Sequence, residues 1–222
     1  MLNIYIADST FLKEQKVWEK SIQLVSDDRR EQILSFHSME DRCRSLTASL
    51  LLRLALGKEA VSYEAAVFSK GEHGKPMLEH ANLHFNLSHA GTWAMCALAD
   101  REVGADIECL FRFDGKKKRM AGIARKCLTM KERAFLEKSD HCEEDLIRIW
   151  TKKESFVKMT GEGLSRDLST VDTMQGICYE QRTLPDGYCA TVCTESFCGP
   201  GIWQEVKWNE EDQEAVLTCM MS

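Results

Sequence analysis

Residues 103–108 place two carboxylates where they could act together. The alternating sequence predicts a β-strand, in which successive side chains point to opposite faces. Asp106 and Glu108 then project from one face, while Ala105 and Ile107 project from the other. Carboxylates held side by side repel each other unless a cation lies between them, and hard oxygen ligands suit magnesium. The alternative is a solvent-facing polar edge, which this segment alone favours.

A predicted helix near residue 150 carries a second pair of charges. Helical periodicity puts Leu146, Trp150 and Val157 on one apolar stripe. Glu154 and Lys158 lie one turn apart at the border of this stripe, so that an acid and a base sit beside the core. The alternative is an ordinary i,i+4 ion pair, which contributes only about 0.3–0.5 kcal/mol.

Two earlier segments supply donors that could face an anion. Residues 74–76 form a Gly-Lys-Pro turn with Lys75 at its tip. Residues 85–89 end a predicted strand with Ser88 and His89, whose side chains can donate hydrogen bonds to an anion. Each segment is a common loop when it is considered singly.

The composition is that of an ordinary globular protein. The 222 residues are 44% apolar and 29% charged, with only 3 Pro and 13 Gly, which excludes disordered and collagen-like chains. A net charge of −6 argues against broad nucleic-acid binding, which needs a basic surface. No early apolar run is long enough to cross a bilayer, and no basic leader precedes one. We therefore expect a cytoplasmic protein without nucleic-acid or membrane partners.

The ten cysteines show no paired metal-binding motif. Cys189 and Cys193 fall on one face of a predicted strand, which makes them core residues. A zinc site that includes Cys198 is the less favoured alternative, because structural zinc prefers tighter cysteine pairs. We therefore expect reduced cysteines that pack as small apolar side chains.

The elements that must position these residues alternate along the chain. Helices are expected over residues 29–36, 38–56, 117–138 and 143–160. Strands are expected over residues 1–6, 93–99 and 102–107 and on both sides of a turn at 184–187. The strands on either side of Asp100 and Arg101 are predicted to form a hairpin. This order predicts two α+β lobes, 1–110 and 111–222, that share one interface.

Four motifs in one order are far more specific than any one of them. The sequence contains G-K-P, F-N-x-S-H, G-x-D-x-E and W-x-x-K-E-x-x-x-K, and it resembles the Sfp-type 4′-phosphopantetheinyl transferases over residues 74–89, 103–108 and 150–164. The resemblance implies two similar α+β lobes related by a pseudo-twofold axis, with the active site in the cleft between them. The length is similar to that of the two-lobed members, which implies a monomer.

The resemblance also implies a reaction. The phosphopantetheine arm of coenzyme A is transferred to a serine of an apo acyl or peptidyl carrier protein, and adenosine 3′,5′-bisphosphate is released. Asp106, Glu108 and Glu154 are then expected to hold magnesium, with Asp106, Glu154 and Lys158 as catalytic residues. Lys158 would stabilise the leaving phosphate. Glu154 would deprotonate the carrier serine, either directly or through a water on the metal.

The expected coenzyme A contacts are spread over both lobes. The resemblance assigns them to Arg29, Arg44, Ser45, Lys75, Pro76, Ser88, His89 and Lys158. Among these, Arg29, Arg44 and Ser45 occupy positions at which the family contacts the ribose 3′-phosphate. Gln32 stands where a second basic residue is often seen, so this phosphate clamp is expected to be weaker or differently built.

A basic run at residues 116–119 is a candidate docking site for an acidic carrier protein. A solvated helix start is the alternative, and it is favoured because charge runs usually are solvated faces. Two other functions remain open for the chain as a whole. A metal-dependent phosphohydrolase would act on coenzyme A without a carrier, and a non-catalytic protein would only bind it.

Overall fold

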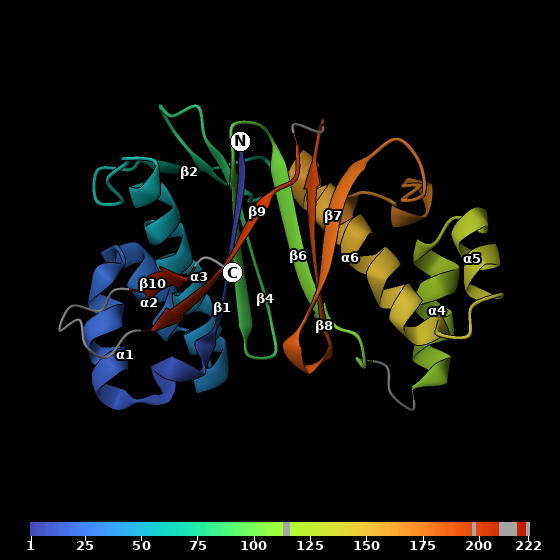
Figure 1. The fold of residues 1–222 in the computed structure, drawn as a ribbon, viewed down its shortest axis with the longest axis horizontal. Coiled ribbons are helices and arrows are strands. Elements are labelled where there is room, and N and C mark those ends of the chain that lie inside the picture. Colours follow the sequence, from blue (N-terminus) through green and yellow to red (C-terminus); the bar gives the residue numbers. More distant parts are fainter. Residues whose placement is uncertain (113–115, 197–198, 209–216, 221–222) are drawn as a thin grey trace.

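The fold consists of two central sheets with a layer of helices on each side (Figure 1). The computed structural model describes residues 1–112, 116–196, 199–208 and 217–220. It confirms the predicted α+β class, while the pseudo-twofold relation of two lobes stays a prediction. The helices are α1 (Gln15–Ser21), α2 (Asp27–Leu34), α3 (Met39–Lys58), α4 (Lys117–Cys127), α5 (Met130–Leu136) and α6 (Cys142–Thr160).

The strands form two larger sheets and one small hairpin. In chain order the strands are β1 (Leu2–Asp8), β2 (Phe68–Lys70), β3 (Pro76–Leu78), β4 (His84–Ala90), β5 (Trp93–Ala99), β6 (Val103–Cys109), β7 (Cys178–Leu184), β8 (Tyr188–Thr194), β9 (Ile202–Trp208) and β10 (Leu217–Met220). The first sheet has the order β10-β9-β1-β5-β4, the second has the order β6-β8-β7, and β2 pairs with β3. Strand β9 runs parallel to β1, so the end of the chain joins the sheet that its beginning starts.

The predicted hairpin around Asp100 and Arg101 is wrong, although both of its strands exist. Strand β5 lies between β1 and β4, which occupy both of its edges. No edge is left for β6, which pairs antiparallel with β8 and places Asp106 opposite Thr191. Strand pairing thus puts β6 with the second half of the chain and β9 with the first. The division at residue 110 remains a prediction for the domains, but the sheets do not follow it.

Capping side chains explain where two of the predicted helices begin. The Ser38 hydroxyl accepts a hydrogen bond from the backbone N–H of Asp41 at 3.0 Å, as expected for the start of α3. The single helix predicted over residues 117–138 is instead α4 followed by α5. The break occurs because Thr129 and Glu132 form a capping box that begins a new helix.

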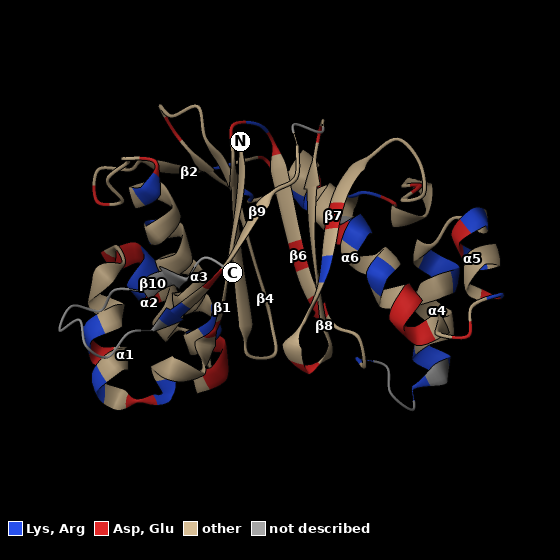
Figure 2. Cartoon of the chain, viewed as in Figure 1, with Lys and Arg blue, Asp and Glu red and all other residues tan. Residues whose placement is uncertain are grey.

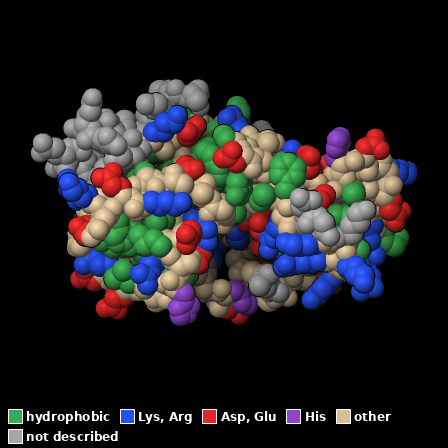
Figure 3. Space-filling model, turned by 90° about the horizontal axis from the view of Figure 1, so that it is seen from below, with side chains coloured by type: hydrophobic (Ala, Val, Ile, Leu, Met, Phe, Trp, Pro, Cys, Tyr) green, Lys and Arg blue, Asp and Glu red, His purple; other side chains and the backbone are tan. Residues whose placement is uncertain are grey.

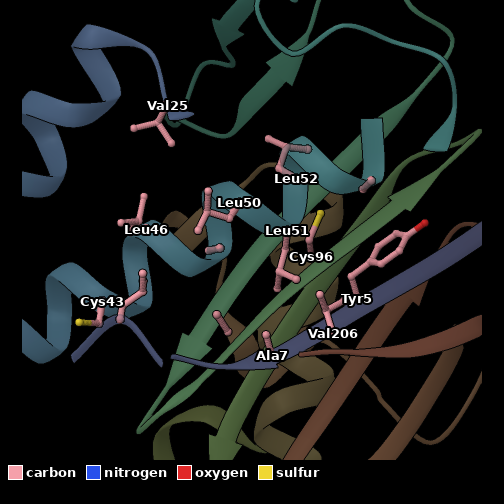
Figure 4. Packing of buried hydrophobic residues seen from close by; sticks show 14 of the residues in the cluster. Tyr5, Ala7, Val25, Cys43, Leu46, Leu50, Leu51, Leu52, Cys96 and Val206 are labelled. Atoms are coloured by element: carbon pink, nitrogen blue, oxygen red, sulfur yellow. The ribbon is translucent and has the colours of Figure 1, made fainter. Parts of the chain in front are cut away.

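The apolar core has three parts, because each central sheet is covered on both faces. One part lies between α3 and the first sheet and includes Leu51, Cys96 and Tyr5 (Figure 4). The second lies between the two sheets, and the third lies between the second sheet and the helices α4 to α6. Strand β1 shows the alternation: Ile4 packs between the sheets, whereas Tyr5 packs toward α3.

Two expectations from the sequence, on the cysteines and on membrane-spanning segments, can be compared with the described residues. Cys189 and Cys193 are both fully buried, as predicted for core residues. Cys198, the third member of the alternative zinc site, lies outside the described residues. Within the part of the chain that the structure describes, no helix is both long and apolar enough to cross a membrane.

Candidate active site

A cavity of about 1300 Å³ lies between the helices of the first half and strand β6 with helix α6. All four sequence motifs contribute to its lining. Its charged and histidine lining residues are Asp28, Arg29, Lys70, His89, Asp106, Glu108, Arg112, Glu154 and Lys158. Figure 3 shows the surface hollowed between the two halves when the molecule is seen from below.

Helix α6 lies directly on β6 because residue 104 is a glycine. A Cβ atom at Gly104 would lie 1.9 Å from the carbonyl oxygen of Ser155 and 2.4 Å from the backbone nitrogen of Met159. Any larger residue would therefore push the helix away from the strand. Strand alternation puts Asp106 on the same side of β6 as Gly104, facing α6. Acidic segments of β6 and basic segments of α6 are consequently neighbours (Figure 2).

Asp106 and Lys158 form an ion pair at the centre of this contact. The Lys158 Nζ lies 2.6 Å from Asp106 Oδ1 and also donates to Ser88 Oγ at 3.1 Å. The Ser88 hydroxyl in turn donates to Asp106 Oδ1 at 3.2 Å. Asp106 is only 5% exposed, and its Oδ2 is buried without a hydrogen-bond partner among the described residues. One carboxylate oxygen is thus left over for a ligand.

Side chains from β4 hold β6 in place across the gap between the two sheets. Asn86 Oδ1 accepts from the backbone N–H of Ala105 at 2.9 Å, and Ser88 Oγ accepts from the N–H of Ile107 at 3.3 Å. These N–H groups lie on the edge of β6 that β8 does not use. Asn86 therefore supports the site, although the sequence assigned it no role. Its place in the F-N-x-S-H motif is the signal that could have identified it.

The three predicted metal ligands all line the cavity, and their environment disfavours negative charge. Burial raises the pKa of Asp106, and the nearby Lys158 only partly opposes this rise. Burial also raises the pKa of Glu108, which forms an ion pair with Arg112. The pKa of Glu154 is raised by burial and then by the charge of Asp106. A cation placed among these carboxylates would stabilise their buried charged forms and reduce the repulsion between them.

The donor chemistry fits a hard divalent cation. Among the described residues, no group of three His, Cys, Asp or Glu side chains is already arranged as a metal site. Asp106 nevertheless keeps a free oxygen, and Glu154 forms no ion pair with any described residue. Oxygen ligands of this kind are those that magnesium prefers. The residue types and the unpartnered oxygen therefore agree with the predicted ligand set.

The first half of the chain contributes Arg29 to the cavity. Its guanidinium donates to Ser49 Oγ and Ser45 Oγ, both at 2.8 Å, and to Gln32 Oε1 at 2.7 Å. Burial lowers the pKa of Arg29. Ser45 is 2% exposed and acts as an acceptor for Arg29. Gln32 thus supports Arg29 from the position where a second basic residue had been expected.

His89 and Arg44 lie at the far end of β4. His89 lines the cavity, and its pKa is lowered by partial desolvation of the ring and by the positive charges of Arg44 and Lys158. Arg44 donates to the carbonyl of Gly91 at 2.7 Å and pairs with Asp41. Of the predicted coenzyme A contacts, Arg44, Ser45 and Lys75 are not among the described lining residues.

Comparison with known proteins places these motifs in one family. The family model described as the 4′-phosphopantetheinyl transferase superfamily matches residues 102–197. A second model, described as the N-terminal part of 4′-phosphopantetheinyl transferase, matches residues 12–101. A 4′-phosphopantetheinyl transferase of Bacillus subtilis is 31% identical over 176 residues, which cover 77% of this chain and 75% of the relative. The chain belongs to the 4′-phosphopantetheinyl transferase superfamily.

Two further relatives show how broad this family is. The 4′-phosphopantetheinyl transferase Sfp of Bacillus subtilis (strain 168) is 31% identical over 68% of this chain and 67% of its own length. The L-aminoadipate-semialdehyde dehydrogenase-phosphopantetheinyl transferase of Saccharomyces cerevisiae is 28% identical over 70% of this chain and 58% of its own length. Membership of the phosphopantetheinyl transferases confirms the resemblance and the enzyme class that the motifs predict.

Not every charged residue of the transferase motifs belongs to the cavity. Lys153, directly before Glu154, is fully buried and pairs with the equally buried Glu132 at 2.8 Å. Its ammonium also donates to the carbonyl oxygens of Leu168 and Val171. Glu132 accepts further hydrogen bonds from the backbone N–H and the hydroxyl of Thr173. This pair therefore joins α5 and α6 to residues 168–173, which follow α6 in the chain.

Proposed function

We propose that this protein transfers the 4′-phosphopantetheine arm of coenzyme A to a serine of an apo acyl or peptidyl carrier protein. The products would be the holo carrier protein and adenosine 3′,5′-bisphosphate. In this reaction the serine oxygen forms a bond to the phosphorus atom that carries the pantetheine arm. The bond from that phosphorus to the bridging oxygen of the pyrophosphate breaks, and its electrons leave with the adenosine bisphosphate.

One observation carries this proposal. The cavity lining combines carboxylates on β6 and α6, the Lys158 ammonium and cationic groups from the first half of the chain. Coenzyme A is a large molecule with several phosphate charges, so it suits a large cavity lined by cationic groups and by carboxylates that could hold a cation. The size and charge pattern of the cavity therefore support this substrate.

The residues have separable tasks in the proposed reaction. Lys158, held by Asp106 and Ser88, would donate to an oxygen of the leaving phosphate as negative charge develops there. Glu154, which lines the cavity with Asp106 and Lys158, would accept the proton of the carrier serine, either directly or through a water molecule. Asp106, Glu108 and Glu154 would hold magnesium, which when bound neutralises the pyrophosphate charge that repels the incoming oxygen.

We further propose that the carrier protein docks near the start of α4. Lys116, Lys118 and Arg119 are exposed there, on a chain with a net charge of −6. In Figure 3, Lys and Arg side chains gather on the half that carries α4. A local positive surface would attract an acidic carrier that the whole enzyme would otherwise repel. Reversing the charge of Lys118 and Arg119 should raise KM for the carrier. It should also make KM depend less on the salt concentration.

The test of the proposed function is direct. The protein is incubated with coenzyme A, magnesium and an apo carrier protein, and the intact mass of the carrier is measured. A transferase adds the mass of one phosphopantetheine group, and a carrier whose serine is replaced by alanine gains nothing. Consumption of coenzyme A without a carrier would instead indicate a phosphohydrolase. Binding of coenzyme A with no change in either molecule would indicate a non-catalytic binder.

A further inference from the structure

Lys75, the last residue of the turn between β2 and β3, is not among the residues that line the cavity. Its side chain is only 11% exposed. The ammonium lies 2.5 Å from Glu102 Oε2, 2.8 Å from the carbonyl oxygen of Met159 and 3.3 Å from that of Val103. An ammonium has three N–H donors, so these three acceptors use all of them. The neighbouring residues Gly74 and Pro76 do line the cavity.

The three acceptors come from parts of the chain that meet beside the site. Met159 contributes one of the last four carbonyls of α6, which have no partner within the helix. A lysine ammonium at this end satisfies that carbonyl and favours the negative end of the helix dipole. Glu102 and Val103 lie at the start of β6. Lys75 thus joins the β2–β3 turn to the first residues of β6 and the last turn of α6.

The last turn of α6 carries a residue on which the proposed chemistry depends. Lys158 directly precedes Met159, and its ammonium reaches Asp106 and Ser88. Helix α6 ends at Thr160, and the following residue, Gly161, adopts a left-handed conformation with φ of 73°. The side chain of Lys75 packs here, because a Cβ at Gly161 would lie 3.6 Å from its Cδ. A movement of Lys75 would therefore shift the backbone of Met159, the residue next to Lys158.

We propose that Lys75 is a positioning residue whose ammonium acts through the end of α6 and does not contact coenzyme A. The inference rests on the proposed function, and it replaces the expectation that Lys75 binds the nucleotide. Its bonds hold the cavity wall formed by Gly74 and Pro76 at a fixed distance from Lys158. Loss of these bonds would misplace Lys158 relative to the reacting phosphate while leaving the nucleotide contacts in place.

The experiment compares three variants with a matched surface control. Lys75→Met keeps the length of the side chain without its charge, and Lys75→Arg keeps the charge. Glu102→Gln removes the charged partner. Lys16→Met is the control, because Lys16 is an exposed lysine on α1 away from the cavity. For each protein, the affinity for coenzyme A, kcat, KM and amide hydrogen exchange of residues 156–162 are measured.

The positioning role predicts a split between turnover and binding. Lys75→Met should lower kcat roughly 10-fold to 100-fold, with an affinity for coenzyme A within about 3-fold of wild type. Amides at the end of α6 should exchange faster, and Lys75→Arg should recover part of kcat. Glu102→Gln should also lower kcat, and combining it with Lys75→Met should cost no more than Lys75→Met alone.

A direct contact with coenzyme A predicts the opposite result for Glu102→Gln. Freed from Glu102, the ammonium would then bind the nucleotide more tightly, and Lys75→Met would weaken binding with kcat unchanged. Either result would overturn the inference, as would unchanged exchange at the end of α6. If Lys75→Met does not fold, Glu102→Gln decides alone. A wild-type enzyme that fails to modify any carrier would reject the proposed function, while the exchange measurement would still test the role of Lys75.

Discussion

Helix α6 supplies two lysines to two buried carboxylates, and the two ion pairs have different uses. In the pair of Lys153 with Glu132, neither side chain is exposed, and every remaining donor or acceptor has a partner in the protein. In the pair of Lys158 with Asp106, the lysine is 30% exposed and Asp106 Oδ2 has no partner among the described residues. The comparison teaches that a completed buried ion pair supports structure, whereas an incomplete one beside a cavity marks a site.

The largest expected effect comes from removing the incomplete carboxylate. Asp106→Asn keeps the shape of the side chain but not its charge, so transfer should fall roughly 10³-fold or more. The fold should survive, because the buried charge whose pKa is raised is removed. Transfer is measured by the intact mass of the carrier, and folding by thermal melting.

Metal removal should reproduce this loss reversibly. Chelation with EDTA should stop transfer, and added magnesium should restore it in the wild type but not in Asp106→Asn. Asp186→Asn, which changes an exposed carboxylate in the turn before β8, is the matched control. Full activity of Asp106→Asn would exclude the proposed site.

Breaking the completed ion pair of Lys153 and Glu132 should lower the stability of the protein. Lys153→Met leaves Glu132 charged, buried and without its cation, which should lower the free energy of unfolding by about 3–5 kcal/mol. Adding Glu132→Leu to this variant should recover part of the loss. Lys152→Met is the control, because among the described residues the Lys152 side chain makes a cation–π contact with Tyr179 and no ion pair. Urea unfolding measures all four proteins, and equal stability of Lys153→Met and Lys152→Met would contradict the structural role.

Replacing Lys158, in the incomplete ion pair, should affect turnover more than stability. Lys158→Ala should lower turnover roughly 10²-fold, with a smaller effect on the affinity for coenzyme A, because a cation on the leaving phosphate acts mostly in the transition state. The melting temperature should fall less than for Lys153→Met, because Lys158 is 30% exposed and the raised pKa of Asp106 favours uptake of a proton. Lys158→Arg should recover only part of the turnover. Lys152→Ala again provides the matched control on the same helix. Near-normal turnover of Lys158→Ala would reduce the second ion pair to an ordinary surface interaction.

The pH dependence of stability should separate Glu154 from an ordinary glutamate. Because its pKa is raised, the folded protein binds this proton more tightly than the unfolded chain does. Glu154 therefore makes wild-type stability fall as pH rises from the ordinary carboxyl pKa to the raised value. Glu154→Gln should be more stable than wild type above this window, and the difference should vanish below it. Urea unfolding of the magnesium-free protein across pH measures the difference, with Glu137→Gln as an exposed carboxylate control.

The smallest effect is expected at His89. If His89 meets the 3′-phosphate, His89→Ala should weaken coenzyme A roughly 10-fold and 3′-dephospho-coenzyme A much less. Because its pKa is lowered in the free protein, phosphate binding should drive proton uptake, and affinity should rise as pH falls. Calorimetry in two buffers measures this uptake, and His37→Ala is an exposed histidine control. Equal losses for both ligands would place His89 elsewhere on coenzyme A.

Local periodicity explains which parts of the site could be predicted from the sequence. Alternation along a strand holds whatever the strand pairs with, so Asp106 and Glu108 were correctly expected on one face, with Ala105 and Ile107 on the other. The helical period likewise placed Glu154 and Lys158 together at the border of the buried stripe. Both arguments need only neighbouring residues.

Contacts between distant residues could not be predicted in this way. The partner of β6 is β8, which lies far along the chain, so the hairpin with β5 was the simpler expectation. The direction of Lys75 depends on the end of α6, which the turn sequence does not reveal. Asn86 supports Ala105 only because the two sheets meet there. The sequence thus indicates which residues face the site better than it indicates what holds them there.

Strand β9 has a consequence for how the protein is made. It pairs with β1, so residues 202–205 join a sheet whose first strand leaves the ribosome long before them. Until β9 has been made, strand β1 has one edge without its neighbour, so the first sheet stays incomplete during most of the synthesis of residues 1–208. Separate production of residues 1–110 would leave that edge exposed. Such a fragment should aggregate unless a peptide containing β9 is supplied.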